Sequence, residues 1–241
     1  MKIAAFVIHL ERATQRRPLV DRLRASLPMD VEVIDAVDGS RLGEAEIASV
    51  YRRNLHRPPY PFRLSASEVA CFLSHRKVWQ RIAGSDLDAA LIVEDDVEVD
   101  WAKLRPVLEA YAPRMTRDDY LRLPRKVRER GPDLEGTGGL VIRPRMLGLG
   151  MQLQLVAPGA AARLLETTRQ FDRPVDTLLQ LQRLHPGVRF LCSRDVLARE
   201  IAVGGSLVQK KRKSLADLVS REAGRPLYRL AVWLDSRMRR P

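Results

Sequence analysis

Two apolar stretches near the start of the chain, and the segment between them, predict how the fold begins. The run "KIAAFVIHL" (2–10) is continuous and of strand length, whereas "VEVIDAV" (31–37) alternates like a second strand. Between them, apolar residues recur at the spacing of one helix face: Leu19, Val20, Leu23 and Leu27. The order strand, helix, strand predicts an α/β protein built on a parallel sheet.

A helix with a marked beginning is predicted after a proline-bearing loop at 52–63. Ser65 and Glu68 form the capping-box pattern S-x-x-E ahead of "VACFLSHRKVWQRI". Glu68 and His75 project onto the face that carries the apolar residues Cys71, Phe72, Val78, Trp79 and Ile82. This face can therefore line a polar cleft. The alternatives are that Glu68 serves only the capping box, and that His75 is a core histidine bonded to a backbone carbonyl.

The rest of the pattern continues the alternation of strands and helices. "AALIVEDDV" (89–97) begins as a strand covered on both faces, and a helix is expected at 101–111. The stretch 113–139 is basic and interrupted by prolines, so we expect it to be largely loop. Further expected elements are a strand at 149–157, helices that begin near Pro158 and Pro174, and a strand at 188–193.

Composition narrows the class of protein. With 241 residues, of which 45% are hydrophobic and 30% charged, the chain fits one globular domain with an appendage. No stretch approaches the roughly 18 to 20 apolar residues that span a bilayer. The apolar run in 1–17 is short, contains His9 and lacks a cleavage site, so a signal peptide is not expected. Cys71 and Cys192 have no metal-ligand spacing, which favours a reduced compartment and a cytoplasmic protein.

The net charge of +12 is concentrated at the end of the sequence. Residues 207–241 hold 10 Lys/Arg against 3 Asp/Glu, a balance of +7 (10 − 3). One helix face there carries apolar residues, with Trp233 beside them: Leu227, Leu230, Ala231 and Leu234. This pattern predicts an amphipathic helix that meets an anionic membrane surface. The alternatives are that the stripe packs on the protein's own core, or that the tail is simply solvated. We expect a main domain at 1–206 and a basic helical tail at 207–241.

Three consecutive carboxylates follow the apolar run "ALIV" (90–93) of the predicted strand. In open α/β sheets, ligands bind beyond the carboxyl ends of the strands. Alternate residues of a strand face the same way, so Glu94 and Asp96 are expected to point together and Asp95 to point away. Paired carboxylates suit Mg²⁺ or Mn²⁺ bound to a diphosphate. Exposed turn residues are the alternative explanation of such a triplet.

Several motifs, taken in order, resemble glycosyltransferase family 25: "FVIHLERATQRR", "VIDAVDG", "SEVACFLSHRKVWQRI", "ALIVEDDV", "PGAAARLL" and "RPVDTLL". The family contains lipopolysaccharide and lipooligosaccharide galactosyltransferases and is related to the collagen galactosyltransferases. The resemblance covers roughly the first 200 residues. It implies a GT-A-like fold with a Rossmann-type, mostly parallel sheet flanked by helices. It also implies a divalent metal, UDP-galactose as donor, and inversion at the sugar carbon.

The resemblance also implies roles for individual residues. Glu94 and Asp96 match the family's acidic metal motif, with Asp95 as a neighbour at the cofactor site. Other matching positions are Glu68, Ser74 and His75 in the signature helix and Asp38 and Gly39 in the "DG" turn. His9 stands where the nucleotide is expected, and Arg12 and Arg16 can approach the diphosphate.

Inversion requires a base that takes the proton of the acceptor hydroxyl. Asp176 is the first candidate because it matches the acidic residue of the family's "P-x-D" motif. The alternative for Asp176 is charge pairing at a helix N-terminus, which stabilises a helix by about 0.3 to 1 kcal/mol. His75 and Glu68 are the reserve candidates.

The expected protein is a metal-dependent inverting glycosyltransferase. It would move a hexose, with galactose expected, from a UDP-sugar to a lipopolysaccharide, lipooligosaccharide or other cell-surface glycan. We expect it in the cytoplasm, peripheral on the inner face of the membrane. One alternative is a nucleotidyltransferase of related fold. Another is a degenerate, non-catalytic member, because His9 replaces the usual asparagine and "MQLQLVAPGA" lacks the usual tyrosine. Nucleic-acid binding is disfavoured, since the excess charge lies in the tail and no such motif occurs.

Overall fold

A seven-stranded sheet forms the centre of the protein in a computed structural model that describes residues 2–201 and 215–238. In sheet order the strands are β2 (Val31–Asp35), β1 (Ile3–His9), β3 (Ala89–Glu94), β7 (Leu153–Val156), β5 (Asp119–Arg122), β8 (Arg189–Ser193) and β6 (Val141–Ile142). Two short antiparallel strands, β4 (Val97–Val99) and β9 (Ala198–Glu200), form a separate ribbon.

Most strands of the large sheet run in one direction. β1 is parallel to both β2 and β3, so that Val7 lies opposite Val33 on one side and Val93 on the other. β7 is antiparallel to β3 and β5, β5 is parallel to β8, and β6 is antiparallel to β8. Only β7 and β6 therefore run against the other five. This confirms the predicted mostly parallel sheet.

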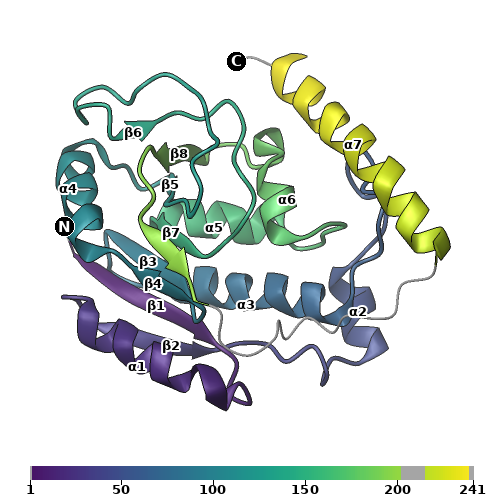
Figure 1. Ribbon diagram of the computed structural model, residues 1–241, viewed down its shortest axis with the longest axis horizontal. Helices are drawn as coiled ribbons and strands as arrows, with labels where there is room; N and C mark the ends of the chain where they lie inside the picture. Colours follow the sequence, from purple (N-terminus) through teal and green to yellow (C-terminus); the bar gives the residue numbers. More distant parts are fainter. Residues whose placement is uncertain (1, 202–214, 239–241) are drawn as a thin grey trace.

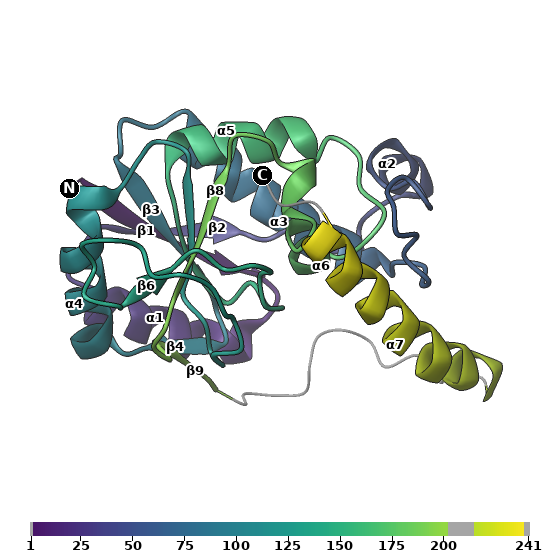
Figure 2. The ribbon, with the colours of Figure 1, turned by 90° about the horizontal axis from the view of Figure 1, so that it is seen from above.

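Helices cover both faces of this sheet (Figure 2). On one face lie α1 (Arg17–Ser26) and α4 (Trp101–Tyr111), and on the other α3 (Ala66–Ala83), α5 (Pro158–Thr167) and the short α6 (Val175–Leu179). A further helix, α2 (Glu44–Val50), was not predicted, and the three 3-10 turns are η1 (Thr14–Arg16), η2 (Ala112–Arg114) and η3 (Gln182–Leu184). The predicted flanking helices are thus present, which confirms the fold class.

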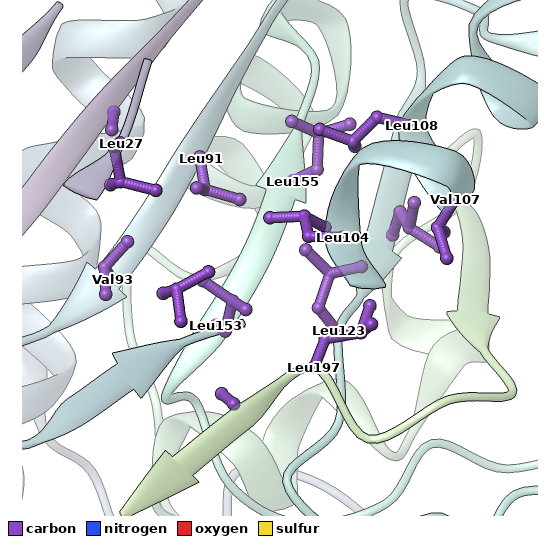
Figure 3. Close-up of a cluster of buried hydrophobic side chains, with 14 of the residues drawn as sticks. Leu27, Leu91, Val93, Leu104, Val107, Leu108, Leu123, Leu153, Leu155 and Leu197 are labelled. Carbon is purple, nitrogen blue, oxygen red and sulfur yellow. The ribbon is translucent and has the colours of Figure 1, made fainter. Parts of the chain in front are cut away.

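The strands contribute side chains to two hydrophobic cores, because successive side chains point to opposite faces of the sheet. Leu91 and Val93 of β3 belong to the core beneath α1 and α4, whereas Ile92 belongs to the core beneath α3 and α5. Figure 3 shows the first core, in which Leu104 and Leu108 of α4 lie against the leucines of the sheet. β3 is buried on both faces, as its continuous apolar run predicts.

The expectation of loop over 113–139 is wrong in one part, because β5 lies inside it near the middle of the sheet. Its sequence carries charges that normally disfavour a buried strand, but each charge has a partner. Asp119 accepts hydrogen bonds from Tyr111 and from Arg189, the latter at 2.6 Å. Arg122 forms a buried ion pair with Glu129.

The predicted helix in the tail is present as α7 (Leu215–Met238), which runs along the outside of the body (Figure 1). Its Leu227, Leu230 and Leu234 are exposed, so the alternative that this stripe packs on the core is wrong. A different side faces the body: Val232 is buried, and Tyr228 accepts a hydrogen bond of 2.7 Å from Arg173. The domain boundary predicted at 206 and the "QKKRKS" run lie outside the described residues.

Among the described helices, none combines the length and the apolar content that crossing a membrane requires.

Candidate functional site

A pocket of about 250 Å³ lies at the carboxyl ends of three adjacent parallel strands, β2, β1 and β3, and is closed by α3. It is somewhat smaller than the about 300–1,000 Å³ of typical small-molecule sites, so it can hold part of a nucleotide sugar. Its lining consists of Ile8, Leu10, Arg12, Arg16, Ala36, Val37, Gly39, Ser67, Ala70, Cys71, Ser74, His75, Glu94, Asp95 and Asp96. Hereafter this is the acidic pocket. Eight of these residues are predicted site residues: Arg12, Arg16, Gly39, Ser74, His75, Glu94, Asp95 and Asp96.

Asp95 is held from two sides at the floor of the acidic pocket. Nδ1 of the buried His9 lies 2.7 Å from one Asp95 oxygen, and Arg16 donates to the other at 2.6 Å. Asp95 therefore has both oxygens occupied by cationic or polar partners. The prediction that Asp95 points away from Glu94 and Asp96 is wrong, since all three line the pocket. β3 ends at Glu94 and the chain turns at 95–96, which breaks the alternation of a strand.

Asp96 is the carboxylate whose charge is least compensated. Burial, followed by the charge of Glu94, raises the pKa of Asp96 to about 6. Its Oδ1 is buried and has no hydrogen-bond partner among the described residues, and Arg16 reaches Oδ2 only at 3.4 Å. A buried acceptor without a donor is costly, so a cation at this oxygen would stabilise the site.

Glu94 connects the carboxylates to α3. His75, which is 1% exposed, places Nε2 3.2 Å from Glu94 Oε1, and its Nδ1 is buried without a partner in the described structure. His75 is thus paired with a carboxylate and not with a backbone carbonyl. Cys71, expected on an apolar face, instead lines the acidic pocket. Its sulfur and ligand atoms of His75 and Glu94 lie within 4.8 Å of one another.

Two overlapping donor sets are therefore available to a metal ion. Glu94 with Asp96 offers hard oxygen ligands that suit Mg²⁺ or Mn²⁺, whereas Cys71, His75 and Glu94 form a mixed set closer to the preference of Zn²⁺. Burial of the thiol group and the charge of Glu94 raise the pKa of Cys71. The residue as a whole is nevertheless exposed on the side that faces the pocket. A thiol must lose its proton to bind a metal. The carboxylate pair, with the free oxygen of Asp96, is the better fit to a divalent cation.

Arg12 and Asp38 brace the loop that follows β2. Arg12 Nε donates to Asp38 at 2.7 Å, and the hydroxyl and amide of Ser40 donate to the other oxygen at 2.7 and 2.9 Å. The bonds from Ser40 and the guanidinium of Arg12 lower the pKa of Asp38 to about 2. Asp38 is therefore ionised at neutral pH and acts on the pocket through Arg12.

Gly39 and Ser74 attach the same loop to α3. A Cβ at position 39 would lie 2.8 Å from the carbonyl oxygen of Ala66, so only glycine allows the loop to come this close. Ser74 accepts a hydrogen bond of 2.9 Å from the amide of Val37 and donates at 2.7 Å to the carbonyl of Ala70. These two predicted site residues thus shape one wall of the acidic pocket.

Glu68 and Asp176 lie outside the lining of the pocket. Glu68 accepts from the amide and hydroxyl of Ser65 at 2.7 and 2.9 Å, which completes the capping box of α3. Asp176 accepts from the amides of Thr177 at 2.7 Å and Gly150 at 3.0 Å. Asp176 nonetheless lies close enough for its charge to contribute to the raised pKa of Cys71. A catalytic role of either carboxylate stays a prediction.

Sequence reasoning missed two lining residues of α3 whose side chains carry an oxygen or sulfur atom, Ser67 and Cys71. Both stand at helical spacing from His75, eight and four residues before it, and hence on the same face. This spacing was the available signal. It was outweighed by the usual burial of cysteine as a small apolar residue.

The sequence profile of "Glycosyltransferase family 25 (LPS biosynthesis protein)" matches residues 2–130. Procollagen galactosyltransferase 2 of Homo sapiens is 35% identical over 95 residues, 38% of this chain and 15% of that protein. Inactive glycosyltransferase 25 family member 3 of Homo sapiens is 34% identical over 148 residues, 57% of this chain and 24% of that protein. The chain thus spans less than a quarter of these relatives.

Among solved structures, S. aureus TarS 1-349 in complex with UDP-GlcNAc superimposes with a TM-score of 0.46 at 13% identity, covering 93% of this chain and 65% of that one. A structural similarity this distant does not indicate a function. The family match is different in kind, since it covers more than half of the chain and includes every residue of the acidic pocket. It confirms the resemblance found in the sequence and, at the level of the family, the expectation of a glycosyltransferase: this chain belongs to glycosyltransferase family 25.

Proposed function

We propose that the protein transfers a hexose, galactose, from a UDP-sugar to a hydroxyl group of a cell-surface glycan such as lipopolysaccharide or lipooligosaccharide, with inversion at the sugar carbon. Family membership and the name of the human procollagen galactosyltransferase relative support the reaction type and the sugar. The profile's own description, an LPS biosynthesis protein, supports the acceptor class. The observation that carries the proposal is the acidic pocket at the carboxyl ends of parallel strands.

In this proposal, Glu94 and Asp96 hold Mn²⁺ or Mg²⁺, which when bound offsets negative charge on the leaving diphosphate. Asp95 keeps Arg16 and His9 in place through its two oxygens, so the guanidinium stands beside the carboxylates throughout. Arg12, half exposed at the rim, offers a second positive charge to a phosphate. His75 orients Glu94 through the 3.2 Å contact between Nε2 and Oε1.

Asp176 is the proposed base that accepts the proton of the attacking hydroxyl. It lies at the start of α6, outside the lining of the acidic pocket but close enough for its charge to act on Cys71. Its oxygens accept hydrogen bonds from the amides of Gly150 and Thr177 and from the hydroxyl of Thr177, which fix the direction of the carboxylate. Glu68, already engaged in the capping box, is assigned to the structure of α3.

Release of UDP from UDP-galactose and UDP-glucose, with and without Mn²⁺, tests the proposal without knowledge of the acceptor. Wild-type protein is expected to release UDP in a metal-dependent way, with the preferred sugar identifying the donor. Asp176→Asn is expected to slow transfer far more than it weakens binding of the donor. Release of pyrophosphate from a nucleoside triphosphate would instead identify a nucleotidyltransferase.

A non-catalytic member of the family is the second candidate. The inactive human relative, 34% identical over 148 residues, favours it. So does the contact between His9 and Asp95, because His9 replaces the family's usual asparagine at this point. Absence of UDP release, together with absence of UDP and Mn²⁺ binding in calorimetry, would establish this alternative.

The exposed leucines of α7 suggest where the protein works. We propose that it is cytoplasmic and binds the anionic inner face of the membrane through Leu227, Leu230 and Leu234 and the basic residues of 207–241. Vesicles containing anionic phospholipid should bind the wild type and lose binding when these three leucines are replaced by glutamine. Val196→Gln, which changes an exposed apolar residue outside α7, is the control and should leave binding intact. Equal vesicle binding by the triple variant and the wild type would refute this part of the proposal.

A further inference from the structure

A second cavity, of about 510 Å³, lies between the segments 122–129 and 146–152 and the inner side of α7. Its volume is within the range of about 300–1,000 Å³ typical of small-molecule sites. Five basic side chains and one acidic side chain line it: Arg122, Arg125, Lys126, Arg128, Arg229 and Glu129. This cavity, hereafter the basic groove, is not part of the acidic pocket.

The single carboxylate of the basic groove is fully used by the protein itself. Glu129, buried, forms an ion pair with Arg122 and accepts from the amides of Arg128 and Gly148, each at 2.9 Å. Nε of the buried Arg122 still lacks a partner among the described residues. Glu129 therefore cannot neutralise the remaining cations of the groove.

Three of those cations are available to a ligand. Arg125 forms an ion pair with Glu200, but Lys126, Arg128 and Arg229 are exposed and form no ion pair with any described residue. They come from two segments about a hundred positions apart, which converge on one cavity. Such a cluster of uncompensated positive charge recognises phosphate or carboxylate groups.

The rest of the lining suits a carbohydrate. Gln152 and Gln180 carry amides that can bond to hydroxyl groups, and the aromatic side chains of Tyr228 and Trp233 line the cavity, where the C–H side of a sugar can pack. Tyr228 is fixed in place by the 2.7 Å hydrogen bond from Arg173, a residue with 0% exposure. The groove is therefore formed before any ligand binds.

The groove is connected to the proposed catalytic residues through one short segment. The carbonyl of Gln152, which lines the groove, accepts a hydrogen bond of 3.0 Å from the amide of Glu94 in the acidic pocket. Two residues earlier, the amide of Gly150 donates to Asp176. The segment 150–152 thus contacts the groove, the acidic pocket and Asp176.

We propose that the basic groove binds the acceptor and that this acceptor is an anionic saccharide, one that carries a phosphate or carboxylate group near the sugar that is extended. This inference rests on the proposed glycosyl transfer. Lys126, Arg128 and Arg229 bind the anionic group, and Tyr228 and Trp233 pack against the sugar ring. In this proposal, the acidic pocket binds the donor's diphosphate together with the metal, and the basic groove binds the anionic group of the acceptor.

Calorimetric titration of full-length protein with maltose 1-phosphate, and with maltose, tests the proposal. The protein should bind the phosphorylated sugar, with an affinity that falls as the salt concentration is raised. Its affinity for maltose should be lower by at least about tenfold. Combined replacement Lys126→Gln, Arg128→Gln and Arg229→Gln should weaken the phosphorylated sugar by about tenfold or more. The matched control Arg22→Gln, Arg24→Gln and Arg53→Gln removes the same charge from exposed positions elsewhere and should change nothing.

Three results would overturn the proposal. They are equal binding of the two sugars, equal loss in the groove variant and the control variant, and no binding of maltose 1-phosphate. If the groove variant, unlike the control variant, also lost binding to anionic vesicles, the groove would be a site for phospholipid headgroups. UDP release by wild-type protein is measured separately. Its absence would refute the proposed function while leaving the sugar titration to decide about the groove.

Discussion

The acidic pocket and the basic groove differ in how the chain supplies their charges. The carboxylates of the pocket are three neighbours at the end of β3, whereas the free cations of the groove come from 126–128 and from α7. In the pocket, Asp95 is buried and held by His9 and Arg16, while the free cations of the groove are exposed. The proposed metal site thus depends on one short sequence, whereas the proposed acceptor site forms only after distant segments have packed together.

The largest effect is expected from removing the least compensated charge of the acidic pocket. Asp96→Asn should reduce metal-dependent release of UDP from the donor by about 10²-fold or more, because the metal loses an oxygen ligand. The matched control is Asp86→Asn, an exposed aspartate paired with Lys2, which should retain wild-type turnover. Unchanged turnover and unchanged Mn²⁺ dependence in Asp96→Asn would refute the proposal that this pocket binds the metal.

The buried ion pair beneath the groove provides the next effect, on stability. Glu129→Gln leaves Arg122 buried without its counter-charge and should lower the free energy of unfolding by about 3–5 kcal/mol in urea denaturation. Glu98→Gln, which breaks an exposed pair with Arg199, should lower it by less than about 1 kcal/mol. Similar decreases in the free energy of unfolding for both variants would show that the pair of Arg122 and Glu129 is more exposed to solvent than the structure indicates.

A smaller effect is the pH dependence of stability, which is expected for the acidic pocket and not for the basic groove. Burial and the charge of Glu94 raise the pKa of Asp96 from 3.8 to about 6, so the folded protein binds this proton more tightly than the unfolded chain. Stability is therefore lost as the pH rises from about 4 through 6. In buffer with a chelator, Asp96→Asn should be more stable than the wild type by about 1–3 kcal/mol at pH 7.5, and equally stable below pH 4. Lys126→Gln, at an exposed residue of the groove, should show no such dependence in thermal melts.

The smallest effect concerns the second donor set. Cys71→Ser should leave Mn²⁺ affinity within about twofold of the wild type, because a protonated thiol contributes little to a hard cation. Zn²⁺ binding, measured in the same titration, should weaken. A large loss of Mn²⁺ affinity would shift the metal from Glu94 and Asp96 to the set that includes Cys71.

The same contrast explains how much of the fold followed from sequence. Elements with one clear periodicity were predicted, such as β1, α1 and α4, because each needs only its own apolar face to be recognised. β5 was missed because Asp119 and Arg122 look unsuited to a buried strand. Their partners are known only from the fold: Arg189, far along the chain, pairs with Asp119, and Glu129, from the loop that follows β5, pairs with Arg122. α2 has no buried residue, so it left no apolar pattern to detect.

The candidate site divides in the same way. The neighbourhood of Glu94, Asp96 and His75 could be predicted, since it depends on one strand end and one helix face. The inward position of Asp95 could not, because it depends on Arg16 reaching across from the segment after β1. The groove could not be predicted at all, since its inner wall is the side of α7 that turns away from the exposed leucines.

The placement of α7 has a consequence for how such proteins diversify. Every residue that lines the acidic pocket lies within the first 96 positions, whereas Tyr228, Arg229 and Trp233 of the groove lie in a helix attached near the end of the chain. Under the proposed function, mutations in α7 can therefore change recognition of the acceptor during evolution while every residue of the acidic pocket stays the same. The hydrogen bond from Arg173 to Tyr228 fixes that part of the helix to the body of the protein.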